Sequence, residues 1–307
     1  MSALTFTVLA IALAGPVPEL LARSAWPMRA PRAAIVLWQS IAAAAVLSAF
    51  SAGLAIASGL FTRRPGGGPD WSPAAEIGAL GWPLWLSSVG VFALTLLIGV
   101  RLVASAVIVA VETRRRRAHH RMVVDLLGDH RHGSGVRVID VAEPLAYCLP
   151  GIRSRVVVSE GTLSALSHSE ITAILRHERA HLRARHDLVL EAFIAVHTAF
   201  PRFVRSGSAL HAVHLLVELL ADDAAVRAVG RAPVARALVA CAAARTPAGA
   251  MAAGGTTAVI RVRRLTGPPN SMLLSLGAYL AAAVVLVVPT IAVAVPWLAE
   301  LNRIFHP

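Results

Sequence analysis

Four long runs of apolar residues dominate the pattern of hydrophobic and polar positions along the chain. They cover residues 3–22, 34–61, 82–111 and 272–298. About 20 apolar residues in a helix cross the hydrocarbon core of a bilayer. The pattern therefore predicts three transmembrane helices, a more polar middle block and a fourth transmembrane helix.

The first and third runs carry features that the other two lack. Pro16 and Pro18 predict a kink in the first run. A cleaved secretory signal is the alternative for this run, but such a signal requires a basic amino-terminal region. The first 11 residues contain no basic residue, so we expect an uncleaved span. Arg101 lies inside the third run, and we expect it to contact a partner group or to lie near an interface.

Basic residues in the loops predict the orientation in the membrane. The first loop contains Arg23, Arg29 and Arg32, and four arginines at 114–117 follow the third run directly. Arginine in short loops favours the cytoplasmic side. We therefore expect a multi-pass cell-membrane protein with its amino terminus outside and residues 113–270 in the cytoplasm.

Strand patterns are confined to the start of the middle block. The β-branched segments 136–141 and 155–159 predict two short strands. Between them, the segment 144–151 is apolar but is interrupted by Pro and Gly. This composition favours an edge strand.

Helical periodicity follows the strands. Ser167 and Glu170 fit a capping box at the start of a helix. Apolar residues then recur at helical spacing. Three further helices and a Gly-rich connection are predicted at 188–200, 209–229, 233–245 and 247–255.

The helix that Ser167 and Glu170 cap contains the sequence HERAH, an HExxH motif. Residues four apart on a helix lie on one face, so His177 and His181 can offer two imidazole nitrogens to one Zn²⁺. Glu178 projects beside them, where it can take a proton from a metal-activated water. This spacing predicts a metallopeptidase site, although a chance match is the alternative for any motif.

A third ligand is expected, because catalytic zinc sites usually have three protein ligands. Glu218 lies in the apolar stretch HLLVELLAD, where an unpaired carboxylate is costly. Asp222, one turn later, can accept the second ring N–H of a ligating histidine. The alternative is that both acids lie on the polar stripe of an amphipathic helix.

Four other residues are weaker candidates for the site. His214 precedes Glu218 by one turn and can face the same site, although a surface histidine is the alternative. Arg227 can pair with Asp222 or with a substrate carbonyl. His186 and Asp187 can support the ligands, or they can end one helix and begin the next.

Composition narrows the class of partner. The chain is 56% hydrophobic and 15% charged, and all 29 of its basic residues are arginine. Of these, 22 lie in 113–270, which favours contact with anionic lipid headgroups. No DNA- or RNA-binding motif is present, so direct nucleic-acid binding is not expected. Cys148 and Cys241 fall in the predicted cytoplasmic block, where no disulfide is expected.

The motifs of this chain resemble the gluzincin pattern of integral-membrane metallopeptidases. The resemblance rests on HExxH, on the E-x-x-A-D of ELLAD that follows it, and on the lead-in PLAYCLPGIRSRVVVSEGTLSALSHSEITAIL. With three spans before this block and one after it, the chain is similar to the BlaR/MecR group, metallopeptidase family fifty-six. The resemblance implies a mostly α-helical membrane protein with four transmembrane helices and an inserted α+β gluzincin-like zinc peptidase domain.

The resemblance also implies roles for individual residues. His177, His181 and Glu218 are expected to bind Zn²⁺, Glu178 to act as general base, and Asp222 to orient a ligating histidine. The segment AYCL is expected to be the edge to which an extended substrate adds as a strand, through Ala146, Tyr147, Cys148 and Leu149.

Two features depart from that family. Many relatives have Asp five residues after the second histidine, where this chain has His186 followed by Asp187. Few residues follow the fourth span, so the extracellular penicillin-binding sensor is expected to be missing. Direct β-lactam sensing is then not implied, and a signal has to enter through the spans or the loop 62–81.

These observations predict three transmembrane helices in 1–112, a cytoplasmic zinc metallopeptidase domain in 113–270, and a fourth transmembrane helix with a short tail in 271–307. The predicted function is a zinc metalloendopeptidase that cleaves a cytoplasmic protein in regulatory signalling, such as a transcriptional repressor. The alternatives are a membrane quality-control peptidase of the HtpX or CAAX-protease type, and a non-catalytic scaffold or metal sensor.

Overall fold

The structure is a computed structural model that describes residues 2–57, 77–78, 81–128, 135–151, 154–200, 207–242, 251–252 and 257–305. Most of the predicted connections 62–81 and 247–255 lie outside the described residues. The described part is mostly helical, with one small sheet.

Among the described residues, four helical segments are long and apolar enough to cross a membrane: Ala3–Arg23, Pro31–Ile56, Trp82–Leu126 and Met272–Ala292. The first segment covers α1 (Ser2–Ala14) and α2 (Pro16–Arg23). The other three lie in α3 (Pro31–Ala57), α5 (Trp82–Leu127) and α12 (Met272–Phe305). The break between α1 and α2 confirms the predicted kink, because Pro16 begins a new helix after Gly15. The apolar helices indicate a membrane protein, and the side of the membrane on which each end lies stays a prediction.

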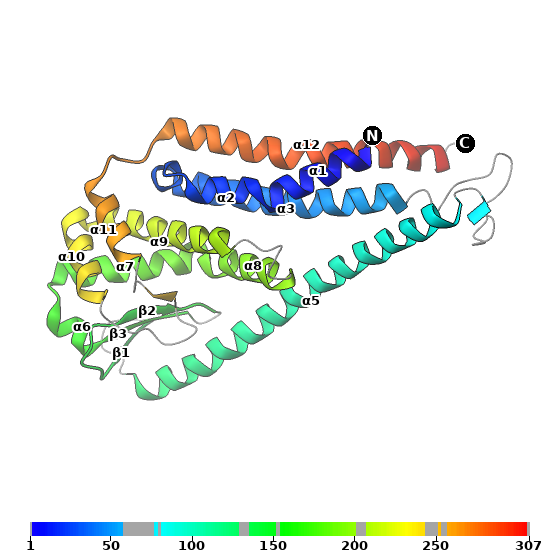
Figure 1. Cartoon of the computed structure of the whole chain (residues 1–307). Coiled ribbons are helices and arrows are strands. Elements are labelled where there is room, and N and C mark those ends of the chain that lie inside the picture. The colour runs from blue at the N-terminus through cyan, green and yellow to red at the C-terminus, as the bar shows by residue number, and fades with distance from the viewer. Residues whose placement is uncertain are drawn as a thin grey trace.

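Figure 1 shows the start of α1 and the end of α12 at one end of the molecule, and the sheet with its surrounding helices at the other. The helix α5 is 46 residues long and runs obliquely from the first end to the second. It crosses the predicted domain boundary at residue 112 without a break, because the arginine-rich segment that follows the apolar run continues the helix.

The middle block forms a sheet and a group of helices. Its elements are β1 (Val136–Ile139), β2 (Ala146–Leu149), β3 (Arg155–Ser159), α6 (Glu160–Ala165), α7 (His168–Ala184), α8 (His186–Ala199), α9 (Gly207–Val229), α10 (Arg231–Cys241), β4 (Met251–Ala252) and α11 (Ala258–Thr266). The pattern predicted β1, β3, α7, α8, α9 and α10, but it did not predict α6, α11 or β4.

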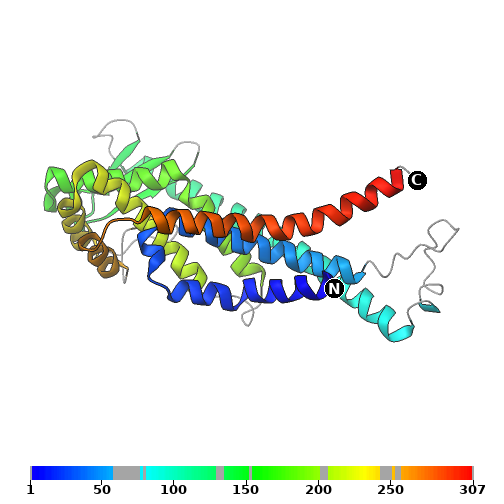
Figure 2. The same ribbon diagram turned by 90° about the horizontal axis from the view of Figure 1, so that it is seen from above.

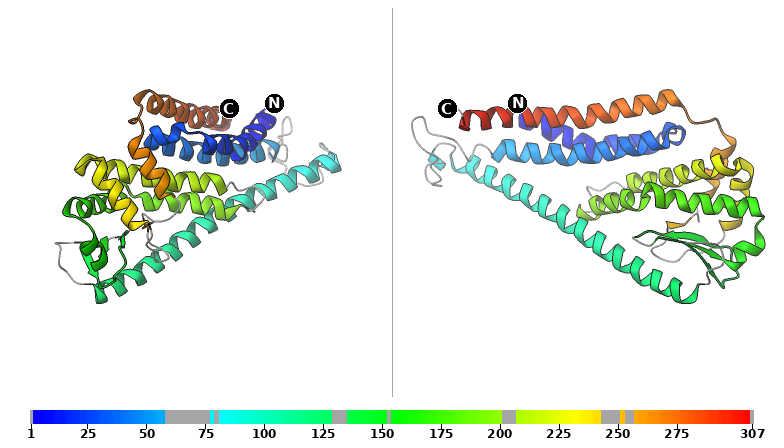
Figure 3. Two further views of the ribbon diagram at one scale, coloured as in Figure 1. Left: turned by 60° about the vertical axis from the view of Figure 1, so that its left-hand side comes forward. Right: turned by 180° about the vertical axis from the view of Figure 1, so that it is seen from behind.

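The helices α8 and α9 lie between the apolar helices. In Figure 3 they run alongside α3 on one side and approach α5 on the other, and in the view from above in Figure 2 they lie behind α3. Arg101 and Ser105 of α5 donate hydrogen bonds to the carbonyls of Ala199 (3.0 Å) and Ala195 (2.7 Å) near the end of α8. These contacts supply the partner that was expected for Arg101 and join α5 to the middle block.

The sheet is packed on both faces. Its strand order is β1-β3-β2-β4, with β1 parallel to β3 and the other pairs antiparallel. One face packs on α7 and α10 through a cluster that includes Ala146 and Val158. The other packs on α5 through Tyr147, Leu149 and Val124. The sheet is therefore held between α5 and the helix that carries the HExxH motif.

The prediction that β2 is a free edge strand is wrong over part of its length. Tyr147 pairs with Ala252 and Cys148 pairs with Met251, so the two residues of β4 cover that edge. The reason is the return of the chain after α10, which brings an extended segment against β2. No local pattern of two residues could predict this pairing.

Candidate metal centre

The helix α7 presents the HExxH motif in its second half. Ser167 and Glu170 form the predicted capping box, and the Ser167 N–H donates to the Glu170 carboxylate at 2.9 Å. Such a cap stabilises a helix by about 1 kcal/mol and fixes its first turn. His177, Glu178 and His181 then lie on the buried side of α7, at 5%, 1% and 2% exposure.

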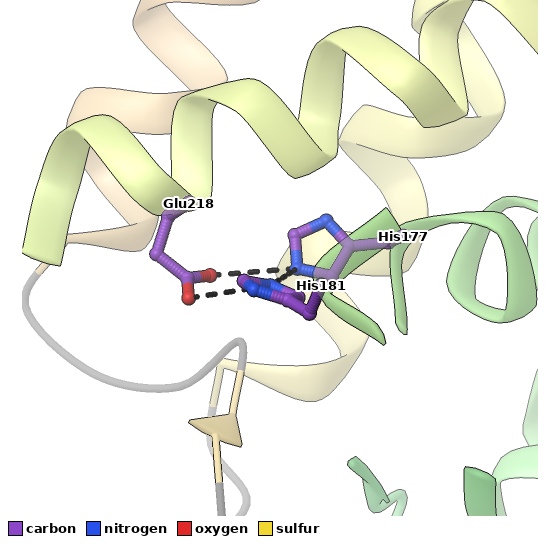
Figure 4. A group of neighbouring side chains, drawn as sticks. All are labelled: His177, His181 and Glu218. Atoms are coloured by element: carbon purple, nitrogen blue, oxygen red, sulfur yellow. Dashed lines mark hydrogen bonds and ion pairs between the residues drawn. The ribbon is translucent and has the colours of Figure 1, made fainter. Parts of the chain in front are cut away.

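Figure 4 shows Glu218 of α9 facing both histidines of α7. His177 Nε2 and His181 Nε2 are 3.1 Å apart. Glu218 Oε2 lies 3.4 Å from His177 Nε2, and Oε1 lies 3.6 Å from His181 Nε2. Tetrahedral zinc with bonds of about 2.0–2.1 Å separates its ligand atoms by roughly 3.3 Å. The three side chains therefore have the mutual spacing that one such ion requires.

The partners of the two imidazoles fix which nitrogens face each other. Asp222 Oδ1 lies 3.0 Å from His177 Nδ1, and His186 Nδ1 lies 3.1 Å from His181 Nδ1. We assign the ring protons to Nδ1 of His177 and of His181, because a carboxylate can only accept and a histidine can accept. In the neutral rings the Nε2 lone pairs then point at the Glu218 carboxylate. Two imidazole nitrogens and a carboxylate oxygen that face one point form an N, N, O donor set that fits zinc.

The turn between α7 and α8 positions His186. Arg185 has φ 51° and ψ 43° and ends one helix while it precedes the next. A non-Gly residue in this left-handed region costs of order 1 kcal/mol, so the packing around the turn has to compensate. Asp187 does not reach a ligating histidine. It pairs with Arg117 of α5 at 3.2 Å, and Glu191 pairs with the same guanidinium at 2.6 Å.

Arg261 of α11 also belongs to the site, and its role was not predicted from the sequence. Its side chain is buried, at 1% exposure, and donates to the two Asp222 oxygens at 2.6 and 2.8 Å. Its Nη1 also lies 2.7 Å from Glu218 Oε2. One positive charge therefore holds the proposed third ligand and the acid that orients His177. The signal in the sequence was an arginine flanked by Ile260 and Val262 in a short apolar segment.

Glu178 lies beside the ligands in a setting that suits a base. Burial is the main cause that raises the pKa of Glu178 to about 7. The charge of His177 lowers this pKa, and the charge of Glu218 raises it. Glu178 Oε2 has no hydrogen-bond partner within the described part of the chain. Burial raises the pKa of the neighbouring Cys148 thiol, and the charge of Glu178 acts in the same direction.

The ligating groups differ in their protonation. Burial lowers the pKa of His181 to about 3, so this imidazole is neutral. Burial opposes charge on His177 as well, but hydrogen bonds to Asp222 and Glu218 outweigh it and raise the pKa to about 9. Burial would raise the pKa of Glu218, but His177, His181 and Arg261 lower it to about 2. A metal that binds here has to displace the His177 proton, because only neutral imidazole is a ligand.

The four residues of β2 point in alternating directions. Tyr147 and Leu149 face α5, and the Tyr147 hydroxyl lies 2.8 Å from His120 Nε2. Ala146 packs toward α7, and Cys148 approaches Glu178 on the same face. Of the segment that was expected to hold substrate, Cys148 is the residue whose pKa responds to the charge of Glu178.

Two of the weaker candidates lie apart from the buried centre. His214 is exposed on α9. Partial desolvation of its ring lowers its pKa, and the charge of Glu218 opposes this effect. Arg227 is also exposed. The predicted pairing of Arg227 with Asp222 is wrong, because Asp222 binds Arg261 and His177 instead. The cause is α11, which places a closer cation against Asp222.

Comparison with known proteins adds a family to this geometry. A model of Peptidase family M48 matches residues 110–218, about a third of the chain. The match contains the HExxH motif and ends at Glu218. It indicates a metallopeptidase and supports the resemblance to membrane zinc metallopeptidases, whereas the narrower resemblance to the BlaR/MecR group is not shown. No curated protein and no solved structure matches the chain.

Proposed function

We propose that the chain is a membrane-embedded zinc metalloendopeptidase whose site opens to the cytoplasm and cuts a protein at an internal peptide bond. The observation that carries the proposal is the meeting of His177, His181 and Glu218 from two helices, with the carboxylate of Glu178 beside them. The match to Peptidase family M48 over the same residues supports it. The apolar helices on both sides of this block in the sequence support a membrane location.

The chain's own side chains divide the work of hydrolysis. When bound, zinc supplies Lewis acidity that polarises a peptide carbonyl and acidifies a water. His177, His181 and Glu218 hold the ion, and Asp222 and His186 keep the two imidazoles oriented. Glu178 takes a proton from the attacking water and passes it to the leaving amine. Burial raises the pKa of this carboxylate to about 7, which favours uptake of that proton, and a bound cation lowers the pKa from there.

An extended substrate is proposed to lie along β2. The pairing of β4 with Tyr147 and Cys148 supports this, because it demonstrates that this edge can accept an antiparallel strand. The edge is near the base, since the charge of Glu178 acts on the pKa of the Cys148 thiol in β2. In this proposal a substrate backbone replaces β4 along β2, and its scissile bond lies near Glu178.

Two substrate classes fit this chemistry. Regulatory cleavage of a cytoplasmic protein such as a repressor is one, and it rests on the resemblance to the BlaR/MecR group. Quality-control cleavage of membrane proteins, as in HtpX-like peptidases, is the other. The match to Peptidase family M48 favours the second class, because the HtpX-like alternative belongs with that family.

The test compares the fragments made in cells that carry the wild type or Glu178→Gln. The glutamine keeps the shape of the side chain and removes the base. Fragments that depend on Glu178 identify the substrate, and their identity separates a repressor from damaged membrane proteins. If a cellular phenotype survives the substitution unchanged and no such fragment exists, the non-catalytic scaffold or metal sensor replaces the peptidase.

A further inference from the structure

A cavity of about 280 Å³ lies among the apolar helices, and none of its lining residues belongs to the metal centre. Its walls come from α1, α2, α3 and α5 and from α8 and α9, which lie between α3 and α5. A volume close to the lower limit of about 300 Å³ for small-molecule sites has room for one narrow ligand. It is too small for a whole two-chain lipid.

The lining of this cavity is almost entirely apolar. The small residues Ala42, Ala45 and Ala49 on α3 leave the space. The larger residues Ile98 and Leu102 on α5 and Phe193 on α8 close it. Among the described residues that line it, His197 is titratable and none is Asp, Glu or Arg. Helices of this composition are surrounded by lipid hydrocarbon in a membrane. A hydrocarbon chain is therefore the occupant that suits an apolar cavity between them.

One lining residue offers a polar group that needs a partner. Trp38 is 2% exposed, and within the described part of the chain its indole N–H has no hydrogen-bond acceptor. Buried donors in folded proteins are nearly always paired. An occupant with a carbonyl oxygen at the Trp38 end and a hydrocarbon tail beyond it satisfies both features of the cavity.

The length of the cavity matches half a bilayer. Trp38 and Ala49 line it 11 residues apart on α3, which corresponds to about 16 Å along the helix. One leaflet contributes about 15 Å of hydrocarbon. Arg32, exposed near the start of α3 and before Trp38, lies on the side where a phosphate headgroup would be.

We propose that this cavity binds one acyl chain of a membrane phospholipid from the leaflet nearest the peptidase block, with the ester carbonyl accepting the Trp38 N–H. The bound chain contacts Phe193 of α8 and Leu210 of α9, the helices that also carry His186 and Glu218. The lipid site therefore touches the two helices that support the metal centre. This inference rests on the proposed membrane location and not on peptidase activity.

The test uses the full chain in lipid nanodiscs that contain a phospholipid with a photoactivatable group in mid-chain. Ala45→Trp fills the cavity from α3, and Ala43→Trp places the same bulk on the exposed side of α3, outside the lining. We expect mass spectrometry to find label on lining segments of α3, α5 and α8 in the wild type. Ala43→Trp should retain this label, and Ala45→Trp should lose it at least five-fold at an unchanged melting temperature.

A second variant tests the polar contact. Trp38→Phe keeps an aromatic ring and removes the N–H, so the yield of label at subsaturating probe should fall about five-fold, the effect of one hydrogen bond. Equal labelling of the wild type, Ala45→Trp and Trp38→Phe overturns the proposal. Labelling needs no hydrolysis, so Glu178→Gln should label like the wild type whether or not the peptidase proposal holds.

Discussion

Arg261 gives a quantitative test of how the metal centre is held. Arg261→Met keeps an unbranched apolar stem but removes a guanidinium that contacts Asp222 at 2.6 and 2.8 Å and Glu218 at 2.7 Å. Removing one partner of a buried ion pair costs about 3–5 kcal/mol. We expect about 3 kcal/mol, the lower end of that range, because His177 still donates to Asp222 and a bound cation still compensates Glu218.

The assay is thermal unfolding of the purified full chain with zinc, followed by tryptophan fluorescence. With roughly 2–4 °C of melting temperature per kcal/mol, the loss corresponds to about 6–12 °C. Arg261→Lys should recover part of it, because an ammonium keeps the charge but not the two-pronged contact. The dissociation constant for zinc should rise about 10–100-fold in Arg261→Met, as it does when groups behind metal ligands are removed.

Arg236→Met is the matched control. Arg236 also pairs with a glutamate, Glu170, but its side chain is 60% exposed. An exposed pair contributes about 0.2–1 kcal/mol, so this variant should melt within roughly 4 °C of the wild type. If Arg261→Met melts as high as Arg236→Met and binds zinc as tightly as the wild type, Arg261 does not support the metal centre.

Four further outcomes are expected. Glu178→Gln should bind one zinc per chain by metal analysis and lose about 10²–10⁴ in turnover; retained turnover would exclude Glu178 as the base. Glu218→Ala should lose metal that the wild type retains through dialysis, and full retention would remove Glu218 from the ligand set. The kcat/KM profile should fall as the pH drops through a value at or below about 7, because protonated Glu178 cannot act as a base and a bound cation lowers its pKa further; an acid limb well above pH 7 would contradict this. His186→Ala should weaken zinc binding about 10–100-fold, whereas an unchanged affinity would mean that His186 does not orient His181.

The part of the site that the sequence predicted depends on local spacing or on composition. His177 and His181 share a helix face because they are four residues apart, so no tertiary information was needed. Glu218 and Asp222 could be selected because carboxylates are costly in an apolar helix without a partner. The structure brings these residues together as the helix pattern suggested.

The part that the sequence did not predict depends on long-range contacts. Arg261 lies on a 9-residue helix after a Gly-rich stretch, and its link to Asp222 joins residues 39 positions apart. The two residues of β4 have no strand pattern of their own and pair with β2 only in the folded chain. Arg185 occupies a left-handed conformation that its residue type does not favour. Each of these features arises from tertiary packing.

X-ray absorption at the zinc edge of the loaded wild-type protein is the most direct test of the central claim, that His177, His181 and Glu218 hold one ion beside Glu178. The account predicts one zinc per chain with nitrogen and oxygen ligands at about 2.0–2.2 Å, including two imidazoles, and an altered ligand shell or lost metal in Glu218→Ala. Substoichiometric zinc in the wild type, a sulfur ligand at about 2.3 Å, or a spectrum unchanged in Glu218→Ala would contradict it.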